Sequence, residues 1–377
     1  MIAPVLYGAS SGSDRWSSSH RADGRLEILR PRWIYPPGTG LFTAVFLFLQ
    51  LIPLVRRLKK KFPFQVIDSH FGFPEGIAAA LLSVLFRVPF TVTMRGSEVI
   101  HSRFLFRRYG ISWALRRATL VIAVSAPLRK LALDLGVDPE RIAIIPNGVD
   151  ARVFLPRPRA QCRTELGLPL NRPLILSAGH LIELKGHHLV IEAVQRLNEN
   201  GVPVLLLIAG GPPGRGLATF EPYLRRMVAD ARLHDCVQFL GPVSQGRLAD
   251  LMSAADVFCL ASSREGWPNV VHEALACGTP AVATNVGAVP EIISSSQMGL
   301  VVPPGDAAAL TAALKLALDT HWDRDVISTR AHSRSWEQAA RETLEHLSSR
   351  VPEDPGRMFR GPGAATERAG EGHSNLS

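Results

Sequence analysis

Short apolar runs alternate with longer stretches of mixed polarity through most of the chain. The runs have the length of strands, and the segments between them space their apolar residues as helices do. Examples of the runs are TLVIAVS, RIAIIPN, LILSAG, VPVLLLIAGG, CVQFLG, DVFCLAS and TPAVATN. Near-continuous apolar strands that alternate with helices are typical of parallel sheets covered on both faces. The pattern therefore predicts an α/β protein built on parallel sheets.

The alternation is interrupted where a Pro/Arg-rich stretch, FLPRPRAQCR, follows IIPNGVD. A chain of 377 residues also favours two domains. We therefore expect a first α/β domain over residues 1–155 and a second over 156–335, followed by an amphipathic helix over 336–350. Residues 351–377 are rich in Gly, Pro, Glu and Ser and show no periodicity, which predicts a disordered tail.

The formal net charge of +9 is unevenly distributed. Residues 1–155 contain 21 Lys and Arg against 10 Asp and Glu, whereas residues 156–377 contain 21 against 23. Two basic clusters, at residues 56–61 and 103–108, lie beside apolar stretches. Such clusters suit an anionic membrane surface, at about 1 kcal/mol per charge, although a solvated basic face is an alternative. We expect no nucleic-acid partner, because the chain has no recognition motif for one.

The most apolar stretch is LFTAVFLFLQLIPLV, at residues 41–55. It has 15 residues and includes Gln50 and Pro53, whereas a membrane-spanning helix needs about 20 apolar residues. A core or interfacial helix is therefore favoured over a membrane anchor. The chain shows no signal-peptide pattern, and its four cysteines lack the spacing of metal ligands. These features favour a protein of the reducing cytoplasm, held peripherally at the inner face of the cell membrane.

The most informative segment is residues 265–291, EGWPNVVHEALACGTPAVATNVGAVPE. Glu265 and Glu273 are eight positions apart, so on one helix they would differ by about 80° in direction. Gly266 and Pro268 make one continuous helix unfavourable, and we expect a strand, a loop and then a helix. Glu265 then follows the carboxyl end of a strand, and Pro268 occupies the first helical position.

This arrangement would open a helix N-terminus at the amides of Asn269, Val270 and Val271. Such an end binds phosphate through free N–H groups and the helix dipole. Glu273, about one turn further along, would accept hydrogen bonds from ribose hydroxyls. The alternative is an ordinary capped helix with two solvated glutamates. The run as a whole favours a sugar-nucleotide site.

With these motifs in order, residues 64–350 resemble the retaining glycosyltransferases of family 4, also called glycosyl transferases group 1. The sequence of residues 64–100 is most similar to that of the exopolysaccharide or teichuronic-acid type of transferase. The resemblance implies the GT-B fold, in which two Rossmann-like domains face a cleft. It implies an acceptor-side first domain, a second domain that binds the nucleotide-sugar donor, and a last helix, near Trp336, that crosses back. Ligands of such folds lie at the carboxyl ends of the strands.

The resemblance assigns donor-binding roles to several residues. Lys185, in SAGHLIELKGHHLVIEA, matches a lysine that contacts the donor diphosphate, where a cation stabilises the leaving group. His180 stands where the family usually has arginine, which implies weaker phosphate binding because histidine lacks the arginine fork. Val243, in FLGPVSQ, matches a backbone contact to the base. Glu265 matches the glutamate beside the reacting sugar, and Glu291 matches a residue whose role is either structural or supporting.

On the acceptor side, TMRGSE resembles a strand-end motif that usually carries histidine and an aspartate. Arg95 replaces the histidine and Glu98 replaces the aspartate. Arg95 then either points at the donor phosphate or sugar, or pairs with Glu98, and it is a poor general base. His70 and Glu75 lie in the loop IDSHFGFPEG, where the acceptor would approach; a simple loop histidine is the alternative for His70.

The chain departs from the family at its start. Family members open with a strand, a glycine-rich turn and a helix, whereas MIAPVLYGAS resembles the family's second strand. We therefore expect a unit of roughly 30 residues to be missing, through a late start or a truncation. Its absence would expose an unpaired edge of the first sheet. Later in the chain, GGPPGRG at residues 210–216 does not fit a dinucleotide motif.

The predicted function is transfer of a sugar from a UDP- or GDP-linked donor to a lipid-linked or polysaccharide acceptor, with retention. The resemblance implies that no metal or other cofactor is needed; Asp323-Arg324-Asp325, the one DxD candidate, follows a helical stretch rather than a strand. Same-face attack is favoured, because no second carboxylate is placed as a nucleophile. The alternatives are a non-catalytic nucleotide-sugar-binding homologue, a phosphorylase that would use Lys185 to hold a cofactor, and a membrane-anchored scaffold.

Overall fold

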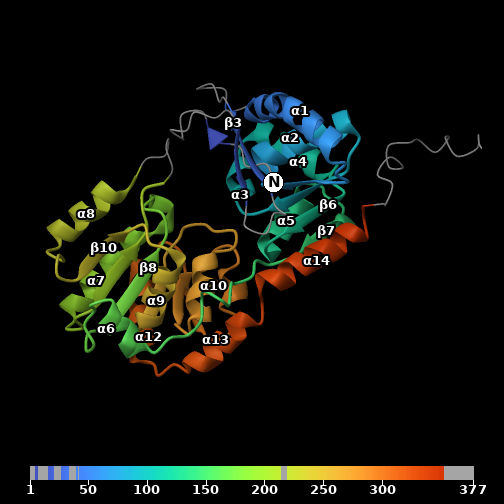
Figure 1. The fold of residues 1–377 in the computed structure, drawn as a ribbon. Helices are drawn as coiled ribbons and strands as arrows, with labels where there is room; N and C mark the ends of the chain where they lie inside the picture. Colours follow the sequence, from blue (N-terminus) through green and yellow to red (C-terminus); the bar gives the residue numbers. More distant parts are fainter. Residues whose placement is uncertain are drawn as a thin grey trace, which may run out of the picture. The chain divides into compact units, whose positions relative to one another are not determined.

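The structure is a computed structural model that describes residues 5–6, 16–20, 27–33, 40, 42–213 and 219–351. The chain forms two compact units (Figure 1). The first unit comprises residues 1–123, 129–143 and 344–377, and the second comprises residues 124–128 and 144–343. The domain boundary near residue 156 stays a prediction. The tail predicted after residue 350 lies outside the described residues, apart from Val351.

The second unit contains a six-stranded parallel sheet in the order β10-β9-β8-β11-β12-β13. The direction of strand addition therefore reverses between the neighbours β8 and β11. The strands are β8 (Leu174–Ala178), β9 (Leu205–Ala209), β10 (Val237–Gly241), β11 (Val257–Leu260), β12 (Ala281–Thr284) and β13 (Gly299–Val302). The helices between and around them are α6 (Arg159–Glu165), α7 (His187–Glu199), α8 (Glu221–Asp230), α9 (Gln245–Ala254), α10 (Asn269–Ala276), α11 (Val289–Ile292), α12 (Ala307–Asp319) and α13 (Arg324–His332).

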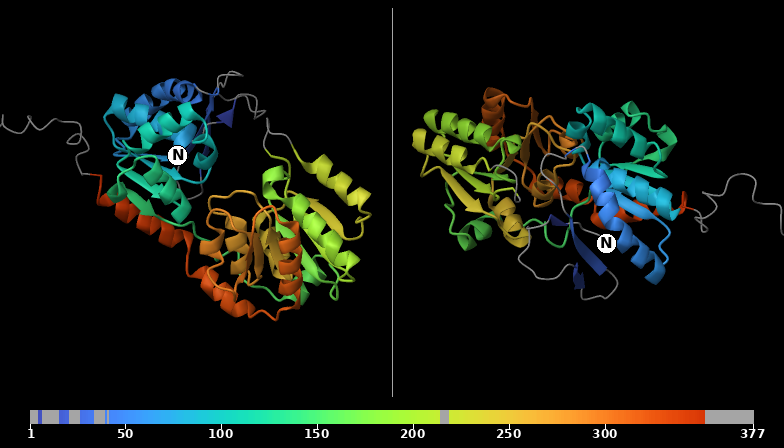
Figure 2. Two further views of the ribbon diagram at one scale, coloured as in Figure 1. Left: turned by 180° about the vertical axis from the view of Figure 1, so that it is seen from behind. Right: turned by 90° about the horizontal axis from the view of Figure 1, so that it is seen from above.

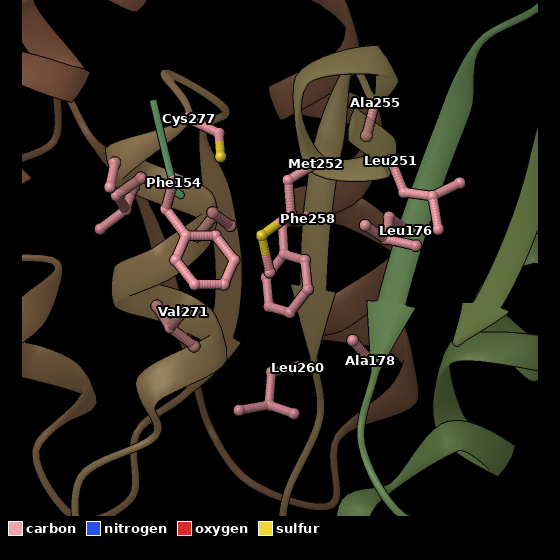
Figure 3. Packing of buried hydrophobic residues seen from close by; sticks show 14 of the residues in the cluster. Phe154, Leu176, Ala178, Leu251, Met252, Ala255, Phe258, Leu260, Val271 and Cys277 are labelled. Atoms are coloured by element: carbon pink, nitrogen blue, oxygen red, sulfur yellow. The ribbon is translucent and has the colours of Figure 1, made fainter. Parts of the chain in front are cut away.

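Successive residues of this sheet face two separate cores, because side chains alternate along a strand. Leu174, Leu176 and Ala178 of β8 face one core, whereas Ile175 between them faces the other. The first core is closed by α9, α10 and α13, and Figure 3 shows Phe258, Met252 and Val271 among its side chains. The second core is closed by α7, α8 and α12, so helices cover both faces of the sheet (Figure 2). This explains why the strands read as unbroken apolar runs.

The first unit contains a four-stranded sheet in the order β4-β5-β6-β7, with β4, β5 and β6 parallel. The strands are β4 (Ile67–His70), β5 (Phe90–Met94), β6 (Leu120–Ala123) and β7 (Ile142–Ile144). Its helical elements are α1 (Thr43–Lys61), the kinked turn η1 (Gly72–Gly76), α2 (Ile77–Phe86), α3 (Glu98–His101), α4 (Leu105–Leu115) and the short turn η2 (Pro139–Arg141). Two further helices, α5 (Ala126–Asp134) and α14 (Trp336–Ser348), have residues in both units.

Helix α1 contains most of the apolar stretch predicted at residues 41–55 and extends it to Lys61. Its buried residues Leu47, Leu51 and Leu54 form a core cluster with Ala78 and Leu82 of α2. This packing agrees with the interpretation of a core helix. Among the described helices, none is long and apolar enough to span a bilayer.

The first strands form a separate small sheet in the order β1-β3-β2. These are β1 (Val5–Leu6), β2 (Trp16–His20) and β3 (Glu27–Trp33), with β1 parallel and β2 antiparallel to β3. Of the segment MIAPVLYGAS, only Val5 and Leu6 lie within the described residues. In the described part of the chain β4 pairs with β5 alone, so it is an edge strand of its sheet.

Candidate functional site

The carboxyl ends of β8 and β11 meet at the point where the strand order of the second sheet reverses. Open α/β sheets bind ligands at such a point. The loop after β8 contains the short helical turn η3 (Glu183–Lys185), and the loop after β11 contains Glu265. The two loops are joined by a hydrogen bond from the Ser263 amide to the Leu184 carbonyl, at 2.9 Å.

Gly186 allows the backbones of the same two loops to approach each other closely. Its φ of +69° is left-handed, and a Cβ atom there would lie 1.9 Å from the Ala261 carbonyl oxygen. Only glycine therefore fits at this position without moving backbone. As a result, the residue before it, Lys185, is held against the loop that carries Glu265.

Lys185 and Glu265 are in direct contact although 80 positions separate them. The Lys185 Nζ donates to the Glu265 Oε1 at 2.6 Å, and the Ser262 hydroxyl donates to the same oxygen at 2.7 Å. The two side chains are 19% and 10% exposed. In the part of the chain that the structure describes, no protein donor contacts the other oxygen, Oε2. The pair is therefore ordered and still presents a carboxylate oxygen and a cation to a ligand.

Helix α10 starts one residue later than the sequence predicts. Pro268, with ψ of 91°, is the N-cap, and Asn269 is the first helical residue. The Val271 amide donates to the Pro268 carbonyl at 3.1 Å, so the prediction that this amide is open is wrong. The amides of Asn269 and Val270 have no acceptor among the described residues. Two N–H groups therefore remain at the N-terminus of α10 for an anion.

Side-chain contacts fix this helix end further. The Asn269 Oδ1 accepts a hydrogen bond from the Asn147 Nδ2 at 2.9 Å. Asn147 belongs to the IIPNGVD segment and is buried. This contact orients Asn269 and leaves its backbone amide, rather than its side-chain oxygen, as the group that could meet a phosphate.

Glu273 lies about one turn into α10 and is largely buried. Burial raises the pKa of its carboxyl group to about 7, because a low-dielectric surrounding disfavours the charged form. In the described part of the chain no side chain forms an ion pair with it. Hydroxyl donors from a ligand would stabilise the carboxylate.

The remaining predicted donor residues lie on neighbouring loops. His180 is exposed and follows the end of β8, and Val243 is half-buried beyond the end of β10. The loops are linked through the backbone, since the Gly210 amide donates to the Gly241 carbonyl at 2.9 Å. A Cβ at Gly210 would lie 1.8 Å from the Gly179 carbonyl. His180 and Val243 thus share the sheet edge with Lys185. The segment 210–216 is described only as far as Pro213.

The two predicted acceptor residues contact each other in the first unit. The Arg95 Nε, just after β5, donates to the His70 Nδ1 at 2.8 Å, so the ring proton of neutral His70 lies on Nε2. That nitrogen is 3.4 Å from the Asp68 Oδ2. Burial lowers the pKa of Arg95. His70 is the last residue of β4, so its predicted position within a loop is wrong.

Glu98 has a structural role in the same region. Its carboxylate is fully buried and accepts hydrogen bonds from the amides of Gly72 and Gly96, at 2.7 and 2.8 Å. It therefore joins the segments that follow β4 and β5. Glu75 lies in the kinked turn η1 rather than in an open loop, and burial raises the pKa of its carboxyl group.

The DxD candidate, Asp323-Arg324-Asp325, lies at the start of α13 in the second unit. Asp323 is the N-cap of α13 and accepts hydrogen bonds from the amides of Asp325 and Val326. Within the described ranges, no group of three or more His, Cys, Asp or Glu residues is arranged to hold a metal ion. Asp323 thus has a local structural function.

Sequence reasoning missed three residues that shape the site: Ser262, Gly186 and Gly287. Ser262 lies two residues after the end of β11, and its hydroxyl donates to Glu265. A Cβ at Gly287, whose φ is +54°, would lie 2.3 Å from the Glu265 carbonyl. The sequence contained signals for all three: a serine at the end of a predicted strand, and glycines within the segments KGHH and NVGAV. Glu291 accepts a hydrogen bond from the Ala126 amide at 3.0 Å.

Comparisons with known proteins agree with this architecture. A family model described as "Glycosyl transferases group 1" matches residues 159–342, and one described as "Glycosyltransferase Family 4" matches residues 14–153. A D-inositol 3-phosphate glycosyltransferase of Pseudarthrobacter chlorophenolicus is 32% identical over 323 residues, which are 81% of this chain and 76% of the relative. Three further relatives with that name are matched over 36–58% of their length.

Two solved structures share the fold. A sucrose-phosphate synthase from Thermosynechococcus elongatus superposes with a TM-score of 0.77 and 24% identity, over 91% of this chain and 87% of that chain. An Anabaena protein, HepE, in complex with UDP-glucose superposes with a TM-score of 0.72 and 21% identity, over 85% of this chain and 86% of that chain. At these identities the likeness concerns the fold.

Proposed function

Since the chain belongs to the group 1, family 4 glycosyltransferases with the GT-B fold, we propose that it transfers a hexose from a nucleoside-diphosphate sugar with retention at the anomeric carbon. The donor is UDP- or GDP-linked, and the acceptor is lipid-linked or a polysaccharide. A fold neighbour in complex with UDP-glucose supports the donor class. The surface of the first unit supports the proposed acceptor class.

The Lys185–Glu265 contact is the observation that carries this proposal. It lies at the carboxyl ends of β8 and β11, beside the N-terminus of α10. The donor diphosphate would lie against Lys185 and the amides of Asn269 and Val270, where cation and helix dipole stabilise negative charge. The ribose hydroxyls would donate to Glu273, and the sugar ring would lie beside Glu265.

In this arrangement Lys185 and the end of α10 supply the positive charge that a metal ion supplies elsewhere. As the bond between the sugar and the diphosphate breaks, charge grows on the leaving phosphate. Fixed donors aimed at that charge lower the barrier without reorganisation. The proposed reaction therefore uses no metal and no further cofactor.

Glu265 acts in this proposal as a stabiliser of the sugar rather than as a nucleophile. Its Oε1 accepts hydrogen bonds from both Lys185 and Ser262, so these two donors already occupy that oxygen. Oε2 remains for a sugar hydroxyl or for the positive charge that develops on the ring. Attack by the acceptor on the face from which the diphosphate leaves would then give retention.

The first unit carries a surface suited to a lipid-linked acceptor. The start of α4, here called the aromatic-basic segment (residues 103–109), exposes Phe104, Leu105, Phe106 and Tyr109 by 55%, 64%, 70% and 69%. The same segment contains Arg103, Arg107 and Arg108, and Arg107 lies over the Phe104 ring at 5.0 Å. Exposed aromatic side chains among arginines suit the headgroup region of an anionic bilayer, which supports a peripheral position at the inner membrane face.

A non-catalytic nucleotide-sugar-binding homologue is the second candidate. It is favoured by the hydrogen bond between Arg95 and His70. While this bond is formed, the His70 Nδ1 cannot take a proton, and Arg95 is not a base. Donor binding without transfer would then be the activity.

Donor binding and hydrolysis would be measured with a panel of UDP- and GDP-sugars on the full chain, on Glu273→Ala and on Glu265→Gln. Glu199→Ala, an exposed glutamate at the end of α7, is the matched control. The enzyme proposal expects turnover that Glu265→Gln removes, and donor affinity that Glu273→Ala weakens. Binding without turnover in the unmodified chain, even with lipid-linked acceptors, would support the second candidate. Absence of binding to every donor would contradict both.

A further inference from the structure

A cavity of about 480 Å³ opens on the first unit, away from the residues discussed so far. It is lined by Ala80, Ser83, Val84, Pro89, Phe90, Arg117, Thr119, Arg141 and Arg350. Phe90 is the first residue of β5, Thr119 directly precedes β6, and Arg141 directly precedes β7. The cavity therefore lies at the amino ends of these strands. Arg95 directly follows the carboxyl end of β5, and His70 is the last residue of β4, so both lie at the opposite edge of the same sheet.

Three arginines line this cavity, and no aspartate or glutamate does. Among the described residues, none of the three forms an ion pair with a carboxylate. Arg117 lies over the Trp113 ring at 4.8 Å, and Arg141 donates to the Arg116 carbonyl at 3.3 Å. Both contacts are with neutral groups. Three like charges around one cavity repel each other, so an anion placed between them would be stabilised.

The remaining lining residues of the cavity are apolar, apart from Ser83 and Thr119. Ala80, Val84 and Pro89 are among them, and the Val84 side chain is 63% exposed. The volume lies within the range of small-molecule sites, about 300–1,000 Å³. Arginine favours phosphate because its planar fork can donate two parallel hydrogen bonds. The combination fits an anionic phosphate group attached to a compact organic moiety.

We propose that this cavity is a second ligand site, which binds a phosphate-bearing group with two or more negative charges through Arg117, Arg141 and Arg350. The site is independent of the donor site, since it lies in the other unit, and of the proposed transferase activity. The phosphate can belong to a soluble phosphate ester or to a lipid headgroup, and both offer the same chemistry to the arginines.

Isothermal titration with inorganic pyrophosphate tests the soluble source. The titration uses the full chain with Lys185→Ala, so that the donor site does not contribute. In that background the double variant Arg117→Gln/Arg141→Gln should weaken binding by about tenfold or more for each arginine removed. Arg226→Gln, an arginine on α8 of the second unit, is the matched control and should leave the affinity unchanged.

Sedimentation with vesicles tests the lipid source. Phosphatidic acid vesicles, whose headgroup is a phosphate monoester that can carry two negative charges, are compared with phosphatidylcholine vesicles, using the same variants. Binding to phosphatidic acid that the double variant weakens at least tenfold, without pyrophosphate binding, would assign the phosphate to a lipid headgroup. The proposal is overturned if neither probe binds, or if the double variant binds both as the unmodified cavity does.

A second variant keeps the test valid if the arginine changes disturb folding. Val84→Glu places a carboxylate at the exposed apolar wall and removes no hydrogen bond. It should abolish pyrophosphate binding, or remove the part of vesicle binding that the double variant removes, while thermal unfolding stays unchanged. If that binding survives Val84→Glu in a folded protein, the proposal is contradicted.

Discussion

Both units bring side chains together near the carboxyl ends of neighbouring parallel strands, but the groups that meet are different. In the second unit, loops from neighbouring strands bring a lysine onto a carboxylate, with Lys185 and Glu265 joined at 2.6 Å. In the first unit, neighbouring strand ends bring a guanidinium onto a neutral imidazole, with Arg95 and His70 joined at 2.8 Å. An ion pair beside an open helix N-terminus is suited to stabilise charge that moves during a reaction. An arginine held by histidine is suited to recognise a fixed anion, so our proposal places the chemistry in the second unit and recognition in the first.

The largest expected effect is the loss of turnover when the ion pair is broken. Lys185→Ala and Glu265→Gln should each lower kcat by about 10²- to 10³-fold, as expected when a charge-stabilising group is removed. Steady-state kinetics with the preferred donor would measure this. Ser262→Ala, which removes the second hydrogen bond to Glu265, should have a smaller effect. If both changes altered only KM, the second unit would merely bind the donor.

The next effect concerns the glycine that holds the two loops together. Gly186→Ala should lower the free energy of unfolding by about 2–4 kcal/mol, because it combines left-handed strain with a backbone overlap. Turnover should fall as well, since Lys185 is displaced. Gly201→Ala is the control, with a φ of +78° but nothing within 4 Å of its Cβ. Equal destabilisation of both variants in chemical denaturation would argue that the overlap is relieved without consequence.

Glu273→Gln should have opposite effects on binding and on stability. Donor affinity should fall about tenfold, since a charged acceptor is lost. The folded-state pKa of about 7 exceeds the ordinary value of 4.5, so stability falls as the pH rises through that window. The variant, which carries no charge, should therefore be more stable than the parent by about 1–3 kcal/mol at pH 8. The gain should disappear below about pH 4.5, which thermal unfolding at several pH values would measure.

The smallest effect is expected in the first unit. Arg95→Gln should raise the KM for the acceptor by about tenfold or less, while donor hydrolysis stays unchanged, because the arginine recognises rather than reacts. Arg116→Gln, an exposed arginine of the same unit, serves as control. A loss of donor hydrolysis as large as that of Lys185→Ala would remove the distinction between the two regions.

The sequence was sufficient for the strands of the second sheet, but not for the contacts between the predicted site residues. Unbroken apolar runs predicted the strands, because helices cover both faces of the second sheet. Lys185 and Glu265 were each predicted to act on the donor. Their contact depends on β8 lying next to β11, which the order of residues along the chain does not specify.

Local details were missed where backbone geometry and burial decide. The start of α10 differs by one residue because Pro268 adopts an extended ψ. The Val271 amide donates to the Pro268 carbonyl and is therefore not open to a ligand. The raised pKa of Glu273 depends on how deeply α10 is buried. The three arginines of the proposed second ligand site come from separate parts of the chain, so no sequence motif contains them together.

The division of the chain between the units has a consequence for synthesis. Residues from 344 onward belong to the first unit, although all of residues 144–343 belong to the second. A ribosome therefore releases the second unit whole before the last part of the first has emerged. Domains generally fold as their residues appear. The first unit would then begin to fold first and be completed last, because the end of α14 joins it only after the second unit has been synthesised.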